Sequence, residues 1–173
     1  MLDIQNYEIL PLIKMAGCDF WRITLPFLYS GFDFVNVPKT IDEVFERVKL
    51  VTFNRQPTLP WDKLLDYQKK YKFKICIDFD DEIFQLPVLH SMSGIWNKNK
   101  VGEFYRKMAE RVDAITCTTE RLAERLRKVN PNTFVIPNAV PFSDRHPEGV
   151  QFNYIPRNNP ETRFGWGGGI SHY

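Results

Sequence analysis

Three carboxylates follow one apolar run of this chain, and their spacing predicts a site of chemistry. Asp78, Asp80 and Asp81 come directly after residues 73–77, whose alternating apolar side chains predict a buried strand. Ligands of open α/β sheets bind at the carboxyl ends of strands, where loops vary on a rigid base. Carboxylates in that place can accept a proton as a general base or hold a divalent metal ion. Aspartates after a strand also serve as turn formers and helix caps, so a purely structural role stays open.

Gly17 and Arg22 form a second candidate site near the start of the chain. They follow an apolar run at residues 7–14, and a helix-like apolar face over residues 20–28, interrupted at Pro26, comes after the glycine. A glycine turn that leads into a helix start can cradle an anion, because it brings backbone N–H groups close to the ligand. A plain turn with Arg22 in solvent is the alternative.

Strand and helix patterns alternate along most of the chain. The expected strands are residues 7–14, 32–37, 49–54, 73–77, 113–118 and 133–137. The expected helices are residues 20–28, 40–48, 63–71, 100–111 and 119–128. Pro11 indicates that the first strand lies at an edge of the sheet or contains an irregularity. Residues 88–99, which include His90, are expected to form a loop. The alternation predicts an α/β fold with a mostly parallel sheet and flanking helices.

The composition bounds the class of protein. The chain has 173 residues with 43% hydrophobic content, which is enough for one core. Its net charge is +2 and no concentrated basic face is visible, so neither nucleic acid nor an anionic membrane is indicated as a partner. No apolar segment approaches the length of a membrane span, and no signal-like stretch opens the chain. Cys18, Cys76 and Cys117 lack metal-like spacing and are expected to be small buried hydrophobes, as in a cytoplasmic protein.

Residues 142–161 differ in character from the preceding segments and predict a linker. They are rich in proline and asparagine and have almost no periodicity. We therefore expect one domain over residues 1–141. Residues 162–173 begin like a new strand, reach the triple glycine of residues 167–169 and stop, which is not how a domain ends. The chain is expected to be the front part of a longer protein.

Four segments of the chain resemble a known family. Residues 76–87, 113–123, 135–141 and 164–172 are similar, in this order, to the group 1 (family 4-like) GT-B glycosyltransferases, especially members found in phages and in bacterial surface-polysaccharide loci. The earlier part of the chain agrees only in its strand–helix rhythm and in the glycine turn followed by Arg22. The resemblance implies two Rossmann-like domains facing across a cleft, with the first contacting the acceptor and the second holding a nucleotide-sugar.

The resemblance also implies roles for individual residues. Asp80 or Asp81 would act as general base toward an acceptor hydroxyl or hydrogen-bond a sugar. Asp78, at the strand terminus itself, is expected to be structural. The further substrate-binding candidates are Gly17, Arg22, His90 and Asn138, and His90 is also a candidate base. The donor diphosphate would lie against Gly167, Gly168, Gly169, Ser171 and His172, where backbone N–H groups need no metal ion or other cofactor. The rest of the donor domain, with the family's paired acidic motif, is absent, so this chain alone is not expected to transfer sugar.

Two alternatives remain. The Asp-x-Asp pattern of Asp78 and Asp80, with Asp81 beside it, is also the metal-binding signature of the GT-A glycosyltransferases. The order of the four segments disfavours that interpretation, because it leaves residues 137–141 and the terminal glycines unexplained. The other alternative is a non-catalytic carbohydrate-binding or scaffolding module, with which the aromatic content of 14% is compatible. The identities of the sugar and the acceptor are not predicted.

Overall fold

The computed structural model describes residues 9–13, 17–30, 41–86, 90 and 92–138. The predicted strand over residues 32–37, the linker over residues 142–161 and the segment over residues 162–173 lie outside the described residues. The predicted domain boundary therefore stays a prediction.

The described strands form one parallel sheet. They are β1 (Ile9–Pro11), β2 (Leu50–Asn54), β3 (Lys74–Phe79), β4 (Ala114–Cys117) and β5 (Thr133–Val135), and they lie in the order β1-β2-β3-β4-β5. Every neighbouring pair is parallel. The predicted α/β fold with a parallel sheet is confirmed, and Pro11 lies in an edge strand as expected, where its missing N–H breaks no ladder bond inside the sheet.

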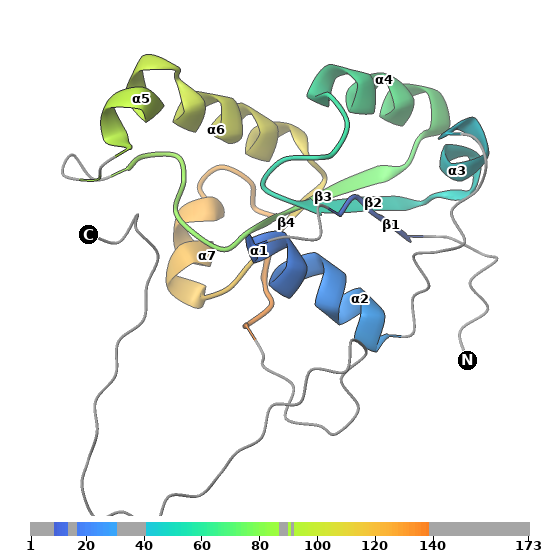
Figure 1. The fold of residues 1–173 in the computed structure, drawn as a ribbon, viewed down its shortest axis with the longest axis horizontal. Helices are drawn as coiled ribbons and strands as arrows, with labels where there is room; N and C mark the ends of the chain where they lie inside the picture. The colour runs from blue at the N-terminus through green and yellow to red at the C-terminus, as the bar shows by residue number, and fades with distance from the viewer. Residues whose placement is uncertain (1–8, 14–16, 31–40, 87–89, 91, 139–173) are drawn as a thin grey trace, which may run out of the picture.

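Helices flank the sheet on both sides, as predicted. They are α1 (Gly17–Asp19), the π-helical turn η1 (Phe20–Thr24), α2 (Leu25–Tyr29), α3 (Ile41–Arg47), α4 (Trp61–Tyr71), α5 (Ser93–Lys98), α6 (Val101–Arg111) and α7 (Glu120–Leu126). Figure 1 shows α4 and α6 on one side of the sheet and α1 and α2 on the other. The expectation of a loop was wrong for residues 93–98, which form α5.

The side of the sheet under α4 and α6 is apolar. Alternate residues of the central strands point to it and are fully buried: Val51, Phe53, Ile75, Ile77, Phe79, Ile115 and Cys117. Met108 of α6 and Leu64 of α4 pack against them, and each such side chain stabilises the fold by about 1.5–3 kcal/mol when fully buried. On α6, Tyr105, Met108 and Ala109 are buried, whereas Phe104 is exposed.

The opposite side of the same strands is polar. Asn54, Asp78 and Thr116 are partners in the strand register, so they form one row across β2, β3 and β4. The helical segment α1-η1-α2 covers this side, and its π turn buries Arg22, Ile23 and Thr24 in succession. The turn comes directly before Pro26, so the predicted interruption is a widened turn within a helix that continues.

The structure also bears on the expectations for the cysteines and for membrane spans. Cys76 and Cys117 are buried in adjacent strands, as predicted, whereas Cys18 is exposed, and the three thiols form no disulfide. Within the described residues, no helix has the length and apolar character needed to cross a membrane.

Candidate active site at the carboxyl ends of β2, β3 and β4

The segment that follows β3 is held in place by contacts with α5 and α6. The indole Nε1 of Trp96 in α5 donates a hydrogen bond to the carbonyl oxygen of Ile83, at 3.1 Å. Gly102 in α6 lies so close that a Cβ atom built on it would be 1.9 Å from the carbonyl oxygen of Phe84. The segment from Asp80 to Leu86 therefore has a fixed path over the sheet edge, and the side chains on it are positioned by the fold.

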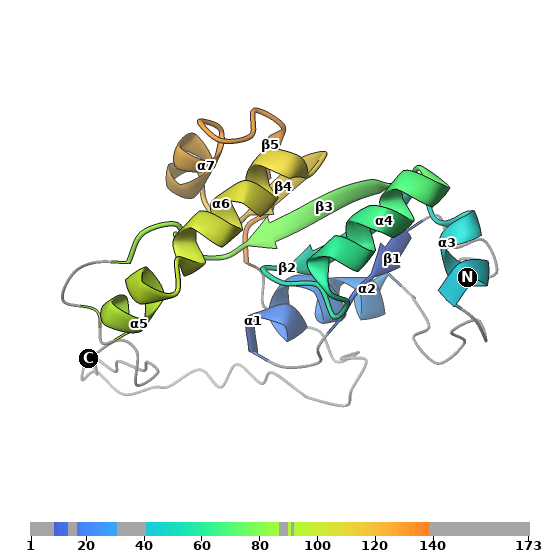
Figure 2. The ribbon, with the colours of Figure 1, turned by 90° about the horizontal axis from the view of Figure 1, so that it is seen from above.

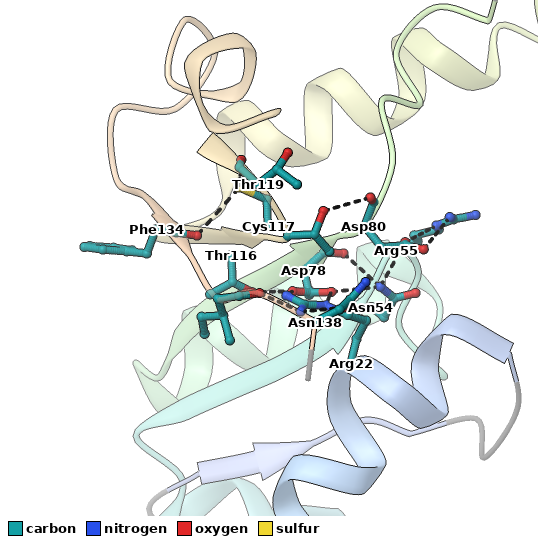
Figure 3. A network of polar contacts seen from close by, with 12 residues as sticks. Arg22, Asn54, Arg55, Asp78, Asp80, Thr116, Cys117, Thr119, Phe134 and Asn138 are labelled. Atoms are coloured by element: carbon teal, nitrogen blue, oxygen red, sulfur yellow. Dashed lines mark hydrogen bonds and ion pairs between the residues drawn. The ribbon is translucent and has the colours of Figure 1, made fainter. Parts of the chain in front are cut away.

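Asp78 is the centre of a buried hydrogen-bond network (Figure 3). Arg22 donates to both of its carboxylate oxygens, from Nη2 to Oδ1 at 2.6 Å and from Nε to Oδ2 at 3.0 Å. Thr116 Oγ1 donates to Oδ1 at 2.7 Å, and Asn54 Nδ2 donates to Oδ2 at 3.0 Å. The side chains of Arg22 and Asp78 are only 4% and 2% exposed. The network satisfies this carboxylate entirely within the protein, so Asp78 has the structural role that was expected.

Arg22 ties three distant parts of the chain together. Besides Asp78, its Nη1 donates to the carbonyl oxygen of Ile136 at 2.6 Å and to Oδ1 of Asn138 at 3.1 Å. Burial lowers the pKa of Arg22, but its hydrogen bonds to Asp78 more than offset this, and the pKa lies above its usual value. Arg22 thus binds a carboxylate and a carbonyl inside the protein. It is neither solvated nor part of an open anion-binding turn, which were the two alternatives considered from the sequence.

Arg55 holds the two other aspartates at the rim. Its Nε and Nη2 donate to Oδ1 and Oδ2 of Asp80 at 2.8 and 2.9 Å, and Nη2 also donates to Oδ2 of Asp81 at 2.8 Å. The Arg55 side chain is 31% exposed, that of Asp80 11% and that of Asp81 69%. Arg55 has a φ of 55°, in the left-handed region that non-glycine residues rarely occupy. Such backbone conformations persist where the surroundings enforce them, and they concentrate at functional sites.

The charge state of Asp80 follows from these contacts. Burial raises the pKa of its carboxyl group, but the hydrogen bonds from Arg55 outweigh this effect, and the pKa lies below its usual value. Nearby, desolvation and the Asp80 carboxylate raise the pKa of the Cys18 thiol to about 11. At neutral pH the site therefore presents an ionised Asp80 beside a protonated thiol. An ionised carboxylate can accept charge-assisted hydrogen bonds, and a lowered pKa makes it a weaker base.

A pocket of about 330 Å³ opens next to Asp80 and Asp81. We call it the carboxylate pocket, and its lining residues are Asp80, Asp81, Glu82, Thr118, Thr119, Arg121, Leu122 and Arg125. The hydroxyl of Thr118 donates to the carbonyl oxygen of Asp80 at 3.1 Å, and the hydroxyl of Thr119 accepts a hydrogen bond from the backbone N–H of Leu122 at 3.2 Å. The pocket combines carboxylates, hydroxyls and guanidinium groups, a set that can hydrogen-bond both the donors and the acceptors of a polyhydroxylated ligand.

The three aspartates do not converge on one point. Asp78 pairs with Arg22, whereas Asp80 pairs with Arg55 (Figure 3). Asp81 also pairs with Arg55. Among the residues that the structure describes, no group of three His, Cys, Asp or Glu side chains is arranged to hold a metal ion. The geometry therefore gives no support to a metal site built from Asp78, Asp80 and Asp81 together.

The remaining predicted site residues are dispersed. His90 accepts a hydrogen bond at Nδ1 from the backbone N–H of Met92, at 3.1 Å, in the turn before α5, and it does not line the carboxylate pocket. Gly17 opens α1 with a φ of 56°, a conformation that glycine adopts without strain. Asn138 is exposed and contacts Arg22. Gly167, Gly168, Gly169, Ser171 and His172 lie outside the described residues.

Several residues of the site were not predicted as site residues. Arg55 directly follows β2, and its pairing with Asp80 joins residues 25 positions apart. Thr118, Thr119 and Arg121 follow β4 in the same way that the aspartates follow β3. The available signal was positional, because polar residues directly after neighbouring parallel strands meet at one edge of the sheet.

Comparisons with protein-family models, with curated proteins and with solved structures found no match. The fold and the carboxylate pocket are therefore the observations from which a function can be inferred.

Proposed function

We propose that this chain is the acceptor-binding part of a glycosyltransferase with two Rossmann-like domains, which transfers sugar from a nucleotide-sugar to an acceptor hydroxyl. The observation that supports this most is the carboxylate pocket, in which Asp80 and Asp81 lie at the end of β3 beside Thr118 and Thr119 from the end of β4. Ligands of α/β proteins bind at this edge of a parallel sheet. The resemblance of four segments to the GT-B family favours a carbohydrate as the ligand.

On this proposal Asp80 binds the acceptor and does not remove its proton. The lowered pKa keeps Asp80 ionised at neutral pH and makes it a poor base. The ionised carboxylate can still accept a charge-assisted hydrogen bond from a sugar hydroxyl. Arg55 fixes the position of the carboxylate through two parallel N–H bonds, so the site is organised before ligand arrives. Asp81, which is more exposed and shares Arg55, is the remaining candidate for the general base.

The donor would be bound by a second domain that follows the predicted linker. Its first residues would be 162–173, with the glycines at 167–169 against the diphosphate. Backbone N–H groups of such a turn can bind phosphates without a metal ion. The protein would work in the cytoplasm, where nucleotide-sugars are available to it.

Calorimetric titration of nucleotide-sugars tests the proposal. A longer form of the protein that includes the donor domain should bind a nucleotide-sugar, and residues 1–141 alone should not. Failure of the longer form to bind any nucleotide-sugar would overturn the glycosyltransferase proposal.

A carbohydrate-binding module without catalysis is the second candidate. It is favoured by the low pKa of Asp80, which suits binding better than proton transfer. It predicts that this chain binds sugars in the carboxylate pocket while the longer form shows no affinity for nucleotide-sugars, so the same titration separates the two candidates.

A further inference from the structure

A second pocket, of about 500 Å³, lies beside the carboxylate pocket. It is formed by α6, by α7 with the residues after it, and by the segment after β3, and Figure 2 shows α6 and α7 next to each other. We call it the basic pocket, and its lining residues are Glu82, Phe84, Gln85, Leu86, Arg106, Arg125, Lys128 and Val129. Its volume is in the range of small-molecule sites.

The charges around the basic pocket are unbalanced. Arg106, Arg125 and Lys128 supply three positive charges, and Glu82 supplies the one negative charge among the lining residues. Glu82 pairs with Arg125 at 3.4 Å, and Arg106 pairs with Glu110 on the same helix at 3.2 Å. The Arg106–Glu110 pair is exposed, and in the Arg125–Glu82 pair the arginine is exposed and the carboxylate half-buried. Solvent-accessible pairs of this kind are worth little energy and can give way to a ligand.

Lys128 belongs to neither of these two ion pairs. Within the described part of the chain its ammonium group has no ion-pair partner, although it lies at the same pocket as Arg106 and Arg125. Like charges gathered in one hollow repel each other, and an anion that enters relieves the repulsion. The net charge of the lining residues matches a group that carries about two negative charges, as a phosphate monoester does near neutral pH.

The walls of the basic pocket are apolar. Phe84, Leu86 and Val129 are half-buried and line the pocket below its charged rim. Carbon-rich faces of a sugar pack well on such walls, and the polar Gln85 can hydrogen-bond its hydroxyls. Inorganic phosphate alone would make no apolar contact with these walls. The pocket therefore suits an anionic group that is attached to an organic ring.

The basic pocket and the carboxylate pocket share two residues. Glu82 and Arg125 line both, and their ion pair stands between the two spaces. The Glu82 carboxylate is also held by the backbone, because its Oε1 accepts a hydrogen bond from the N–H of Phe84 at 3.1 Å. One ligand could therefore reach from the carboxylates of the first pocket to the cations of the second.

We propose that the basic pocket binds the anionic group of a phosphorylated sugar, while the hydroxyls of the same molecule lie in the carboxylate pocket. If the proposed function holds, the acceptor of the transferase is a sugar phosphate. The binding of a sugar phosphate itself does not depend on that function. Recognition of the phosphate needs no transfer reaction and can be measured on this chain.

The test is calorimetric titration of this chain with glucose 6-phosphate, with glucuronate and with glucose. Glucose 6-phosphate should bind most tightly, glucuronate more weakly because it has a single charge, and glucose weakest. In the double variant Arg106→Gln, Lys128→Gln the affinity for glucose 6-phosphate should fall by about tenfold or more, because two charge-assisted contacts are removed. Both side chains are exposed, so thermal unfolding should be nearly unchanged.

Lys107→Gln is the matched control. Lys107 is an exposed cation next to Arg106 on α6, and it does not line the basic pocket. This variant should bind glucose 6-phosphate as the unmodified chain does. Equal binding of glucose and glucose 6-phosphate, an equal loss in the Lys107→Gln control, or no binding of glucose 6-phosphate at all would each overturn the proposal.

The titration also distinguishes this inference from the proposed function. If the longer form binds no nucleotide-sugar but this chain binds glucose 6-phosphate through Arg106 and Lys128, the transferase proposal fails and the phosphate site stands. If the longer form binds nucleotide-sugar and this chain binds no glucose 6-phosphate, the transferase proposal stands and the basic pocket is not a phosphate site.

Discussion

Two groups of arginine and aspartate side chains lie near the carboxyl end of β3, and they differ in burial. In the inner pair, Arg22 and Asp78 are almost entirely buried. In the outer pair, Arg55 binds Asp80 and Asp81 at a rim that opens into the carboxylate pocket. The same side-chain chemistry therefore joins a helix to the sheet in one place and borders an accessible pocket in the other. Accessibility, and not residue type, separates the two roles.

The energetics of the two pairs differ for the same reason. Charges buried without a partner are strongly destabilising, so a buried pair is sensitive to the loss of either member. Asp78 also accepts hydrogen bonds from Asn54 and Thr116, and no carboxylate oxygen is left to bind a ligand. At the rim, water screens the charges and can replace a lost partner. The inner pair should govern stability, and the outer pair should govern binding.

The largest effect is expected from Asp78→Asn. The variant leaves Arg22 buried without a countercharge, and the free energy of unfolding should fall by about 3–5 kcal/mol. Urea unfolding monitored by circular dichroism measures this. Asp81→Asn is the matched control at the exposed rim and should change the free energy of unfolding by less than about 0.5 kcal/mol. Equal losses in the two variants would remove the distinction between inner and outer pairs.

A second effect should come from the helix that holds the rim segment. A methyl group at Gly102 would overlap the carbonyl of Phe84, so Gly102→Ala must displace either α6 or the segment carrying Asp80. We expect a loss of about 1–3 kcal/mol in the free energy of unfolding. Gly94→Ala in α5 is the control, because no atom beyond its chain neighbours and the backbone of its own helix lies within 4 Å of its Cβ position. It should be neutral or stabilising by up to about 1 kcal/mol, and chemical denaturation of both variants checks the contrast.

Arg55 allows its side chain and its backbone to be tested separately. Arg55→Ala keeps the strained left-handed conformation and loses the contacts to Asp80 and Asp81. Loss of these contacts should lower the free energy of unfolding by about 1–2 kcal/mol. Arg55→Gly loses the same contacts but relieves the strain, so it should be more stable than Arg55→Ala by about 1 kcal/mol. Thermal unfolding of the two variants measures the difference. Equal stabilities would mean that position 55 is not strained.

The smallest effect on stability is expected from the titration of Asp80. Its pKa in the folded protein is below that of an unfolded aspartate, about 3.9. Its contribution is therefore fully present above pH about 4 and is lost as the pH falls through the folded pKa. At neutral pH, Asp80→Asn should cost about 1 kcal/mol, and the difference from the unmodified chain should shrink in acid. Urea unfolding of both proteins between about pH 7 and pH 3 checks this, and a difference that grows in acid would contradict it.

The sequence predicted much of the sheet but not what the polar residues on it do. Strands with alternating apolar residues and helices of two or more turns were found because periodicity is a local signal. The short helix α5 was missed because Ser93, Gly94 and Asn97 weaken the helical pattern. The ion pair of Arg22 and Asp78 joins residues 56 positions apart, and no local pattern encodes such a contact.

The candidate site was predicted in position and only partly in composition. Asp80 and Asp81 were selected for their place after a strand, and the structure puts them at a pocket on that edge. Arg22 was selected for the wrong reason, because a cation after a glycine turn looks like an anion site until its buried partner is known. The basic pocket could not be predicted, since Arg106 and Lys128 come together only when α6 and α7 pack.

The most direct test of the proposed role of the outer pair is sugar transfer by an Asp80→Asn variant of the longer form proposed above. Transfer is measured per folded molecule, together with the affinity for the nucleotide-sugar. Asp80 on the acceptor side predicts that transfer falls by about tenfold or more, as expected for one lost charge-assisted hydrogen bond, while nucleotide-sugar affinity stays nearly unchanged. Loss of nucleotide-sugar binding in this variant would contradict that assignment and would place Asp80 at the donor.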